Sequence, residues 1–185
     1  MKYPIKIFSF AIAVLLLITC TSKKSQNSRT LTKDQIRIES IIQNATFEDV
    51  DGNSITLEDF KGKVVLIDFW ETWCGPCLQV FPAMDSLKSE YPDDFEILTV
   101  NLIDGNTKTN VIQFIADNNY DFVYSLDANA VGDEIISLGI PFKVFMDPNG
   151  SLIKTELGSR GTLRDYEMAK VIIEDNKIPD NLINE

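Results

Sequence analysis

Two cysteines in the segment DFWETWCGPCLQ, Cys74 and Cys77, are the residues of this sequence best suited to chemistry. Their spacing fits a metal clip, a structural cross-link or a pair that exchanges electrons with other thiols. A structural zinc site needs about four cysteine, histidine or carboxylate ligands, whereas this chain has no histidine and only 3 cysteines. We therefore expect no metal and no other cofactor at the pair.

A permanent structural cross-link remains the alternative to a redox pair. A Cys-x-x-Cys disulfide closes a very small loop, and stabilisation by cross-linking grows with loop length. The pattern changes from strand to helix at the cysteines, so Cys74 is expected at a helix N-terminus, where unpaired N–H groups and the helix dipole favour its thiolate. Gly75 and Pro76 suit such a turn, since glycine has no Cβ and proline presets φ. These features favour a redox pair in which Cys74 attacks and Cys77 resolves.

Hydrophobic patterns predict the elements that position this pair. An amphipathic segment starts at Asp34, and Asp51-Gly52 predicts a hairpin with short strands at 46–50 and 54–57. The other expected elements are strands over 64–70, 95–103 and 120–126, helices over 77–91, 109–119, 128–139 and 162–176, and a hairpin over 140–158. Strands that alternate with helices, followed by a hairpin and a closing helix, predict an α/β sandwich: a mixed central sheet with helices on both faces.

The N-terminal segment predicts export. Residues 1–19 hold a short basic head and an apolar run of twelve residues at 7–18, which suits a signal peptide and is shorter than the roughly 20 residues that span a bilayer. An uncleaved membrane anchor is the alternative. The LITC sequence that ends at Cys20 resembles a bacterial lipobox, whose cysteine is acylated, although Thr19 departs from the usual small residue. We expect a signal peptide over 1–19, a lipid-anchored flexible tether over 20–33 and a globular domain over 34–185.

The formal net charge of −11 also limits the possible partners. An acidic protein has little affinity for nucleic acid or anionic lipid head groups, so we expect no nucleic-acid partner and membrane attachment only through the lipid on Cys20. With Cys20 as lipid acceptor, one cysteine pair is left in a compartment where disulfides persist. The sequence has no heptad repeat that would indicate an obligate dimer, so we expect a monomer.

The segment VVLIDFWETWCGPC resembles the active-site strand and turn of thioredoxin. Residues 44–160 are similar to the TlpA-like branch of membrane-tethered thiol:disulfide oxidoreductases, including the hairpin FEDVDGNSITLEDFKGK and a central strand–helix insertion. The resemblance implies a thioredoxin-like three-layer sandwich and an enzyme of the bacterial cell envelope that faces the periplasm. It would exchange disulfides with proteins, more as a reductant, in cytochrome c maturation or thiol-redox homeostasis. A membrane electron donor or acceptor would be a further partner.

The resemblance assigns roles to further residues. Asp68 matches the buried acid that handles the proton of the inner cysteine, and desolvation would raise its pKa towards neutrality; a strand residue satisfied by backbone donors is the alternative. Pro141 matches a cis-proline that faces the cysteines and leaves the backbone of Ile140 for a substrate peptide; a trans proline at a strand start is the alternative. Trp73 matches an exposed aromatic that contacts partners, whereas Trp70 is expected in the core.

Gly75 and Pro76 belong to the same substrate-facing surface.

The sequence departs from thioredoxin at Phe142, which replaces a frequent threonine, and in ILTVNLI, where no lysine accompanies the buried acid. A different handling of the proton is therefore expected. Two other functions stay open, a non-catalytic peptide-binding module and a thiol peroxidase, although the Pro-x-x-x-Thr-x-x-Cys pattern of peroxiredoxins is not found around Cys74.

Glu71 stands where the family usually has a small residue. Our hypothesis is that its carboxylate raises the pKa of the Cys74 thiol by like-charge repulsion and shifts the redox balance. In the reduced protein, Glu71→Ala is expected to lower the pKa of Cys74, measured by thiolate absorbance over a pH series. An unchanged titration of Cys74 would contradict the hypothesis.

Overall fold

The structure, a computed structural model, describes residues 30–102 and 107–179. Within these ranges, the residues from Leu31 onward form one compact unit. The expected signal peptide, Cys20 and most of the expected tether lie outside the described residues. The division into segments 1–19, 20–33 and 34–185 therefore stays a prediction.

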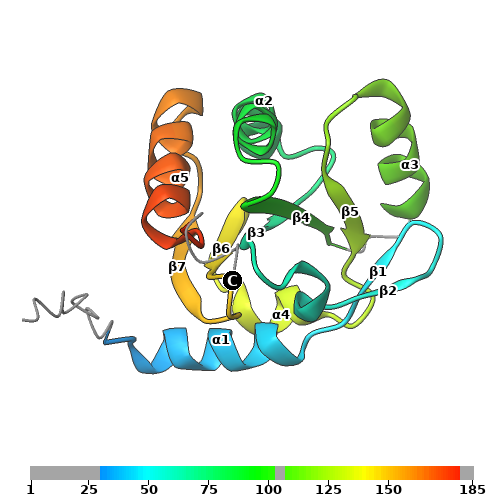
Figure 1. Ribbon diagram of the computed structural model, residues 1–185. Helices are drawn as coiled ribbons and strands as arrows, with labels where there is room; N and C mark the ends of the chain where they lie inside the picture. The colour runs from blue at the N-terminus through cyan, green and yellow to red at the C-terminus, as the bar shows by residue number, and fades with distance from the viewer. Residues whose placement is uncertain (1–29, 103–106, 180–185) are drawn as a thin grey trace, which may run out of the picture. The chain divides into compact units, whose positions relative to one another are not determined.

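One mixed sheet forms the centre of this unit (Figure 1). Its strands are β1 (Phe47–Asp49), β2 (Ser54–Ile55), β3 (Val64–Trp70), β4 (Phe95–Asn101), β5 (Val123–Leu126), β6 (Phe142–Met146) and β7 (Leu152–Leu157). The order across the sheet is β2-β1-β5-β4-β3-β6-β7. Strand β4 is parallel to both β3 and β5, whereas the hairpins β1–β2 and β6–β7 and the pairs β1–β5 and β3–β6 are antiparallel.

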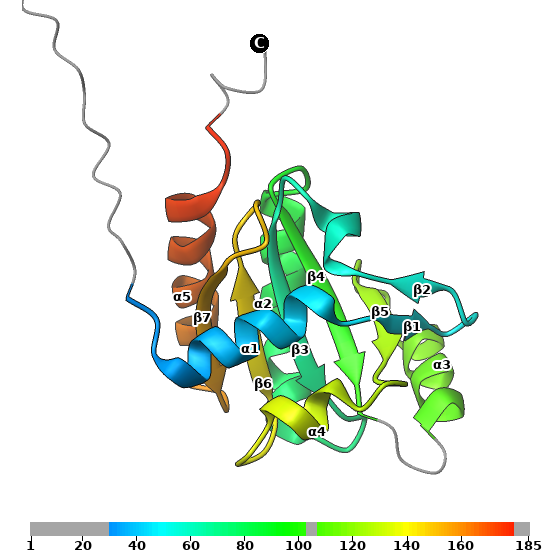
Figure 2. The same ribbon diagram turned by 90° about the horizontal axis from the view of Figure 1, so that it is seen from below.

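Helices cover both faces of the sheet. They are α1 (Lys33–Asn44), the 3₁₀ turn η1 (Leu57–Phe60), α2 (Gly75–Glu90), α3 (Thr107–Asp117), α4 (Val131–Ile135) and α5 (Thr162–Asn176). Helices α2, α3 and α5 lie on one face, and α1 crosses the other face beside α4 (Figures 1 and 2). This arrangement confirms the predicted thioredoxin-like α/β sandwich with its N-terminal hairpin, and β5 is the additional strand that joins that hairpin to β4.

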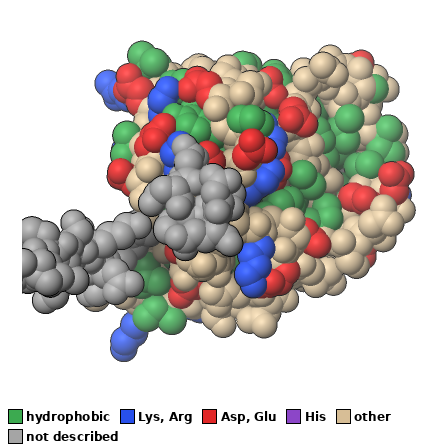
Figure 3. Space-filling view, viewed as in Figure 1, with side chains coloured by type: hydrophobic (Ala, Val, Ile, Leu, Met, Phe, Trp, Pro, Cys, Tyr) green, Lys and Arg blue, Asp and Glu red, His purple; other side chains and the backbone are tan. Residues whose placement is uncertain are grey.

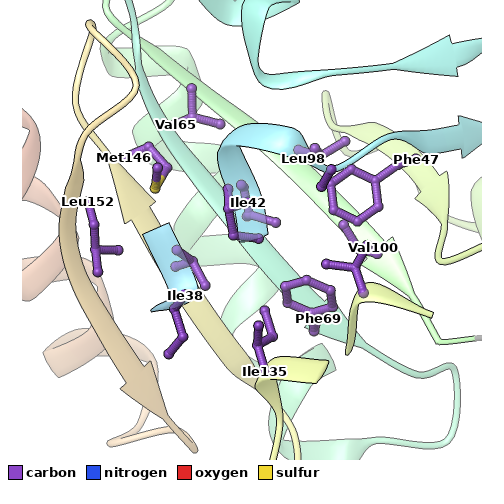
Figure 4. Packing of buried hydrophobic residues seen from close by; sticks show 14 of the residues in the cluster. Ile38, Ile42, Phe47, Val65, Phe69, Leu98, Val100, Ile135, Met146 and Leu152 are labelled. Carbon is purple, nitrogen blue, oxygen red and sulfur yellow. The ribbon is translucent and has the colours of Figure 1, made fainter. Parts of the chain in front are cut away.

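Strand β3 is buried along its whole length, because it has a helical layer on each side. Side chains alternate between the two faces of a strand, and Val65, Ile67 and Phe69 pack against α1 and α4. Figure 4 shows Val65 and Phe69 on this face. Leu66 packs with residues of α2 and α5, and Trp70 packs with residues of α2 and α3. Asp68 lies between Leu66 and Trp70 along the strand and on the same face, so its side chain is directed towards α2.

Helix α1 closes the face opposite to α2. It begins with a capping box, in which the Thr32 hydroxyl accepts from the backbone N–H of Gln35 and the Gln35 side chain accepts from the N–H of Thr32. This arrangement satisfies donors that the first helical turn would leave unpaired. Ile38 and Ile42 lie about one turn apart and are both buried against the sheet (Figure 4).

The helix expected over 128–139 is much shorter in the structure, where α4 ends at Ile135. Ala130 precedes it with a left-handed φ of 57°, and Ile136 is already extended. Gly139 has a φ of 135° just before the Ile140–Pro141 bond. The segment from Ile136 to Ile140 is therefore not helical and leads the chain into β6, and the proline at its end disfavours a helical conformation at the residue before it.

The surface is polar with scattered apolar side chains. On the face shown in Figure 3, acidic and basic side chains are interspersed with exposed apolar ones. Among the helices of residues 30–102 and 107–179, none combines the length and the apolar character that crossing a membrane would require.

Candidate redox site

A disulfide joins Cys74 and Cys77 where β3 leads into α2. Cys74 is the N-cap of α2, and the backbone N–H of Cys77 donates to its Sγ at 3.3 Å. The Cys74 carbonyl oxygen accepts from the N–H groups of Cys77 and Leu78 at 3.0 and 3.1 Å. A helix N-terminus stabilises negative charge, so this position favours a thiolate on Cys74 once the disulfide is reduced.

The turn between strand and helix gives one-sided access to the disulfide. The backbone N–H of Cys74 donates to the carbonyl of Glu71 at 2.9 Å, which turns the chain after β3. Gly75 and Pro76 are exposed, and apart from the adjoining residues and the backbone of its own helix, no atom lies within 4 Å of where a Cβ of Gly75 would stand. Both cysteines are buried, with exposed fractions of 3% and 0%. A partner sulfur would approach over the Gly75-Pro76 side.

The segment before β6 lies against the same site. The Ile140–Pro141 peptide bond is cis, which confirms the isomer that the resemblance implies. Ile140 packs against the cluster that contains both cysteines, and the Pro141 carbonyl accepts from the N–H of Gly158 at 2.8 Å. The indole of Trp73 is 71% exposed, whereas Trp70 is fully buried, as expected.

Asp68 is the buried carboxyl of β3, with an exposed fraction of 1%. Its Oδ1 atom has no hydrogen-bond partner, unlike a carboxylate satisfied by backbone donors. The pKa of Asp68 is raised from 3.8 to about 7: burial is the largest cause, the positive charge of Lys143 opposes the rise, and the negative charge of Asp165 adds to it. The predicted direction of the shift is therefore confirmed, and the group can change protonation near neutral pH.

Sequence reasoning missed Lys143 and Asp165. Lys143 stands opposite Asp68 in the β3–β6 pairing, and its Nζ lies 2.8 Å from the Gly158 carbonyl oxygen and 3.6 Å from Asp165 Oδ2. The lysine that is missing from β4 is thus matched by one on the other side of β3. A lysine inside the apolar run PFKVFM was the available signal, since lysine is almost never buried unless it is paired.

The structure gives two further results for predicted site features. Glu71 is buried, with an exposed fraction of 5%, and its influence on Cys74 stays a prediction. In the described ranges 30–102 and 107–179, no three cysteine, aspartate or glutamate side chains are grouped so that they could hold a metal ion.

A disulfide at a helix N-terminus beside a cis-proline, on a mixed sheet between helical layers, defines a thioredoxin-like protein. The sequence profile named Redoxin matches residues 38–178, and the chain belongs to this family. It is 30% identical over 170 residues to the thiol-disulfide oxidoreductase ResA of Bacillus subtilis, covering 90% of this chain and 94% of that protein.

Two solved structures are also similar. The thioredoxin domain of a thiol-disulfide oxidoreductase from Bacteroides vulgatus matches with a TM-score of 0.59 and 26% identity, over 70% of this chain and 92% of that one. The exposed lipoprotein thioredoxin Etrx1 of Streptococcus pneumoniae matches with a TM-score of 0.55 and 25% identity, over 69% of this chain and 98% of that one.

The raised pKa of Asp68 predicts how stability depends on pH. The folded protein binds the Asp68 proton more tightly than the unfolded chain, so the free energy of unfolding should fall as the pH rises from about 4 to about 7. The variant Asp68→Asn has no ionisable group at this position, so its free energy of unfolding should not fall over this pH range through residue 68. At pH 8 the oxidised variant should be more stable than the parent, by on the order of 4 kcal/mol for a shift of this size, whereas at pH 4 the two should be similar.

Urea denaturation of the oxidised proteins across this pH range measures the effect. Asp93→Asn, which changes an exposed carboxyl on the loop before β4, is the control and should follow the parent. Parallel stability curves for the parent and Asp68→Asn would show that Asp68 has an ordinary pKa.

Proposed function

We propose that this protein is a thiol:disulfide oxidoreductase that exchanges disulfides with other proteins, mainly as their reductant. The observation that carries the proposal is the Cys74–Cys77 disulfide at the N-terminus of α2, beside the cis Ile140–Pro141 bond. Similar proteins whose names state this activity support it.

The first step is an attack by Cys74. Its thiolate, stabilised by the N-terminus of α2, attacks one sulfur of a substrate disulfide. The S–S bond of the substrate breaks, a mixed disulfide with Cys74 forms, and the other substrate sulfur leaves as a thiolate. The burial of both cysteines behind Gly75 and Pro76 limits this attack to a substrate that docks on that side.

The second step belongs to Cys77 and Asp68. The Asp68 carboxylate accepts the proton of the Cys77 thiol, and the resulting thiolate attacks Cys74 Sγ. The Cys74–Cys77 disulfide forms and the remaining substrate sulfur leaves, so the substrate gains two electrons and the protein pair loses two. A donor dithiol outside this chain must then reduce the pair. Asp68 suits the role of base because its pKa of about 7 lets it exchange a proton near neutral pH.

The substrate surface consists of the groups around the disulfide. We infer that the exposed indole of Trp73 contacts an apolar part of the substrate, while the backbone of Ile140 pairs with an extended substrate segment. Leu138 is 82% exposed in the loop before the cis-proline and adds apolar surface next to Ile140. Such a surface favours unfolded or extended protein segments, and an apocytochrome with oxidised cysteines is one substrate of this kind.

We further propose that the protein acts in the bacterial cell envelope, facing the periplasm and anchored through a lipid on Cys20. Residues 1–19 have the pattern of a lipoprotein signal peptide, and residues 20–33 would tether the domain. The similar pneumococcal protein is named an exposed lipoprotein, which supports the proposal.

The two cysteines should differ sharply when they are replaced one at a time. Both Cys74→Ser and Cys77→Ser should lower the rate of insulin reduction by at least about a hundredfold, because the cycle needs both sulfurs. Only Cys77→Ser should accumulate a mixed disulfide with the substrate on a non-reducing gel. A Cys74→Ser variant that still reduces insulin would rule out the proposed attack, and a parent protein that never cycles would favour a peptide-binding module.

The lipid anchor predicts a change of cell fraction. Expressed in a bacterial host, the parent should start at an acylated Cys20 by mass spectrometry and sediment with membranes. Cys20→Ala should lose the acyl mass, because the alanine offers no thiol to acylate. A parent chain that keeps residues 1–19 and no lipid would instead indicate an uncleaved anchor.

A further inference from the structure

The side chain of Lys143 is buried in a layer that is otherwise mostly apolar. Its exposed fraction is 1%, and the side chains of its neighbours along β6, Val144, Phe145 and Met146, are fully buried. Burial of an ammonium group is energetically unfavourable, and exchanging a buried ion pair for apolar residues is often neutral or stabilising. Stability alone therefore gives little reason for a lysine at this position.

Asp165 at the start of α5 holds the lysine in place. Its Oδ2 lies 3.6 Å from Lys143 Nζ and accepts from the Ser159 hydroxyl at 2.8 Å, while its Oδ1 accepts from the backbone N–H of Arg160 at 3.1 Å. Three groups thus hold the carboxyl group of Asp165 in place. Nζ also donates to the Gly158 carbonyl at 2.8 Å, which ties the ammonium to the segment between β7 and α5.

Asp68 is a second acidic group next to this lysine. Directly opposed side chains of an antiparallel pair lie on the same face with Cβ atoms about 5 Å apart, and Asp68 and Lys143 are such a pair. On its parallel side Asp68 is next to Thr99 of β4, which carries no charge. Glu156 of β7 also stands opposite Lys143, but its carboxylate is paired with Lys154 and with Arg160.

We propose that Lys143, held by Asp165, is a positioning residue for disulfide exchange: it stabilises the carboxylate form of Asp68, the form that accepts the proton of Cys77. The inference rests on the proposed function, since it concerns the same redox step. Lys143 of β6 would thus take the role of the lysine that thioredoxin has near its buried acid and that β4 of this chain lacks. The proton still moves only between Cys77 and Asp68.

The two members of the ion pair act on Asp68 with opposite signs. The positive charge of Lys143 lowers the pKa of Asp68 and the negative charge of Asp165 raises it, while burial raises it most strongly. Lys143→Met keeps the length of the side chain and removes the charge, so Asp68 would stay protonated to higher pH. Asp165→Asn removes the negative charge that raises the pKa of Asp68, so this pKa would fall.

The experiment measures the pH profile of the second step. Reduced protein is mixed with the aromatic disulfide 5,5′-dithiobis(2-nitrobenzoate), which forms a mixed disulfide with Cys74 and releases one coloured thiolate. The attack by Cys77 releases the second thiolate, and stopped-flow absorbance gives its rate. In the parent the rate should rise with a midpoint that Asp68→Asn removes.

We expect Lys143→Met to move this midpoint upward by at least about one pH unit, the usual effect of a close opposite charge. Because the midpoint of the parent is expected near pH 7, an upward shift of one unit should lower the rate of the second step at pH 7 about fivefold. Asp165→Asn should move the midpoint downward. If a single variant fails to fold because one buried charge is left unpaired, the double variant Lys143→Met/Asp165→Asn should still show a smaller upward shift.

Lys88→Met is the matched control, because Lys88 is a buried lysine of α2 whose partner is Glu96 rather than Asp68. It should leave the midpoint unchanged. Midpoints of the Lys143 and double variants equal to that of the parent would overturn the inference and leave the proposed function intact. A parent protein that never releases the second thiolate would instead contradict the proposed function itself.

Discussion

The burial of one carboxyl group, that of Asp68, is the constraint on which the arrangement of the site depends. The central strand is covered by helices on both faces, so an acidic side chain in it is desolvated whichever face it points to. Alternation along β3 directs it towards α2, between Leu66 and Trp70. The cost of this burial is tolerated where a proton must be exchanged at neutral pH, and the cysteine pair begins the helix above that face.

The surrounding elements bring the cysteine pair and two charged side chains to the face of the sheet on which Asp68 lies. Helix α2 begins at the cysteines, so its unpaired N–H groups favour charge on Cys74. Strand β6 enters the sheet through a cis-proline and brings Lys143 opposite Asp68. The start of α5 supplies Asp165. Strands β3 and β6 are neighbours in the sheet although 70 residues lie between Trp70 and Pro141 along the chain, and this pairing assembles the redox site.

Local signals were sufficient for much of this structure. The strand pattern of VVLIDFW, the Asp51-Gly52 turn and the change of period at the cysteines depend on neighbouring residues, and each predicts the observed element. The cis form of Pro141 came only from the resemblance, because a sequence does not distinguish the isomers. The Lys143–Asp165 pair escaped prediction because it depends on which strands pair and where α5 begins, and the early end of α4 reflects the path towards Pro141.

The reduction potential of the Cys74–Cys77 pair tests the central claim most directly, by equilibration with glutathione and dithiothreitol buffers. A carboxylate that opposes thiolate formation on Cys74, as we propose for Glu71, favours the disulfide over the reduced form. We expect a potential near that of thioredoxin, about −270 mV, for a protein that donates electrons to substrates. A potential near −120 mV, typical of a disulfide-forming oxidant, or a pair that cannot be cycled, would contradict this function.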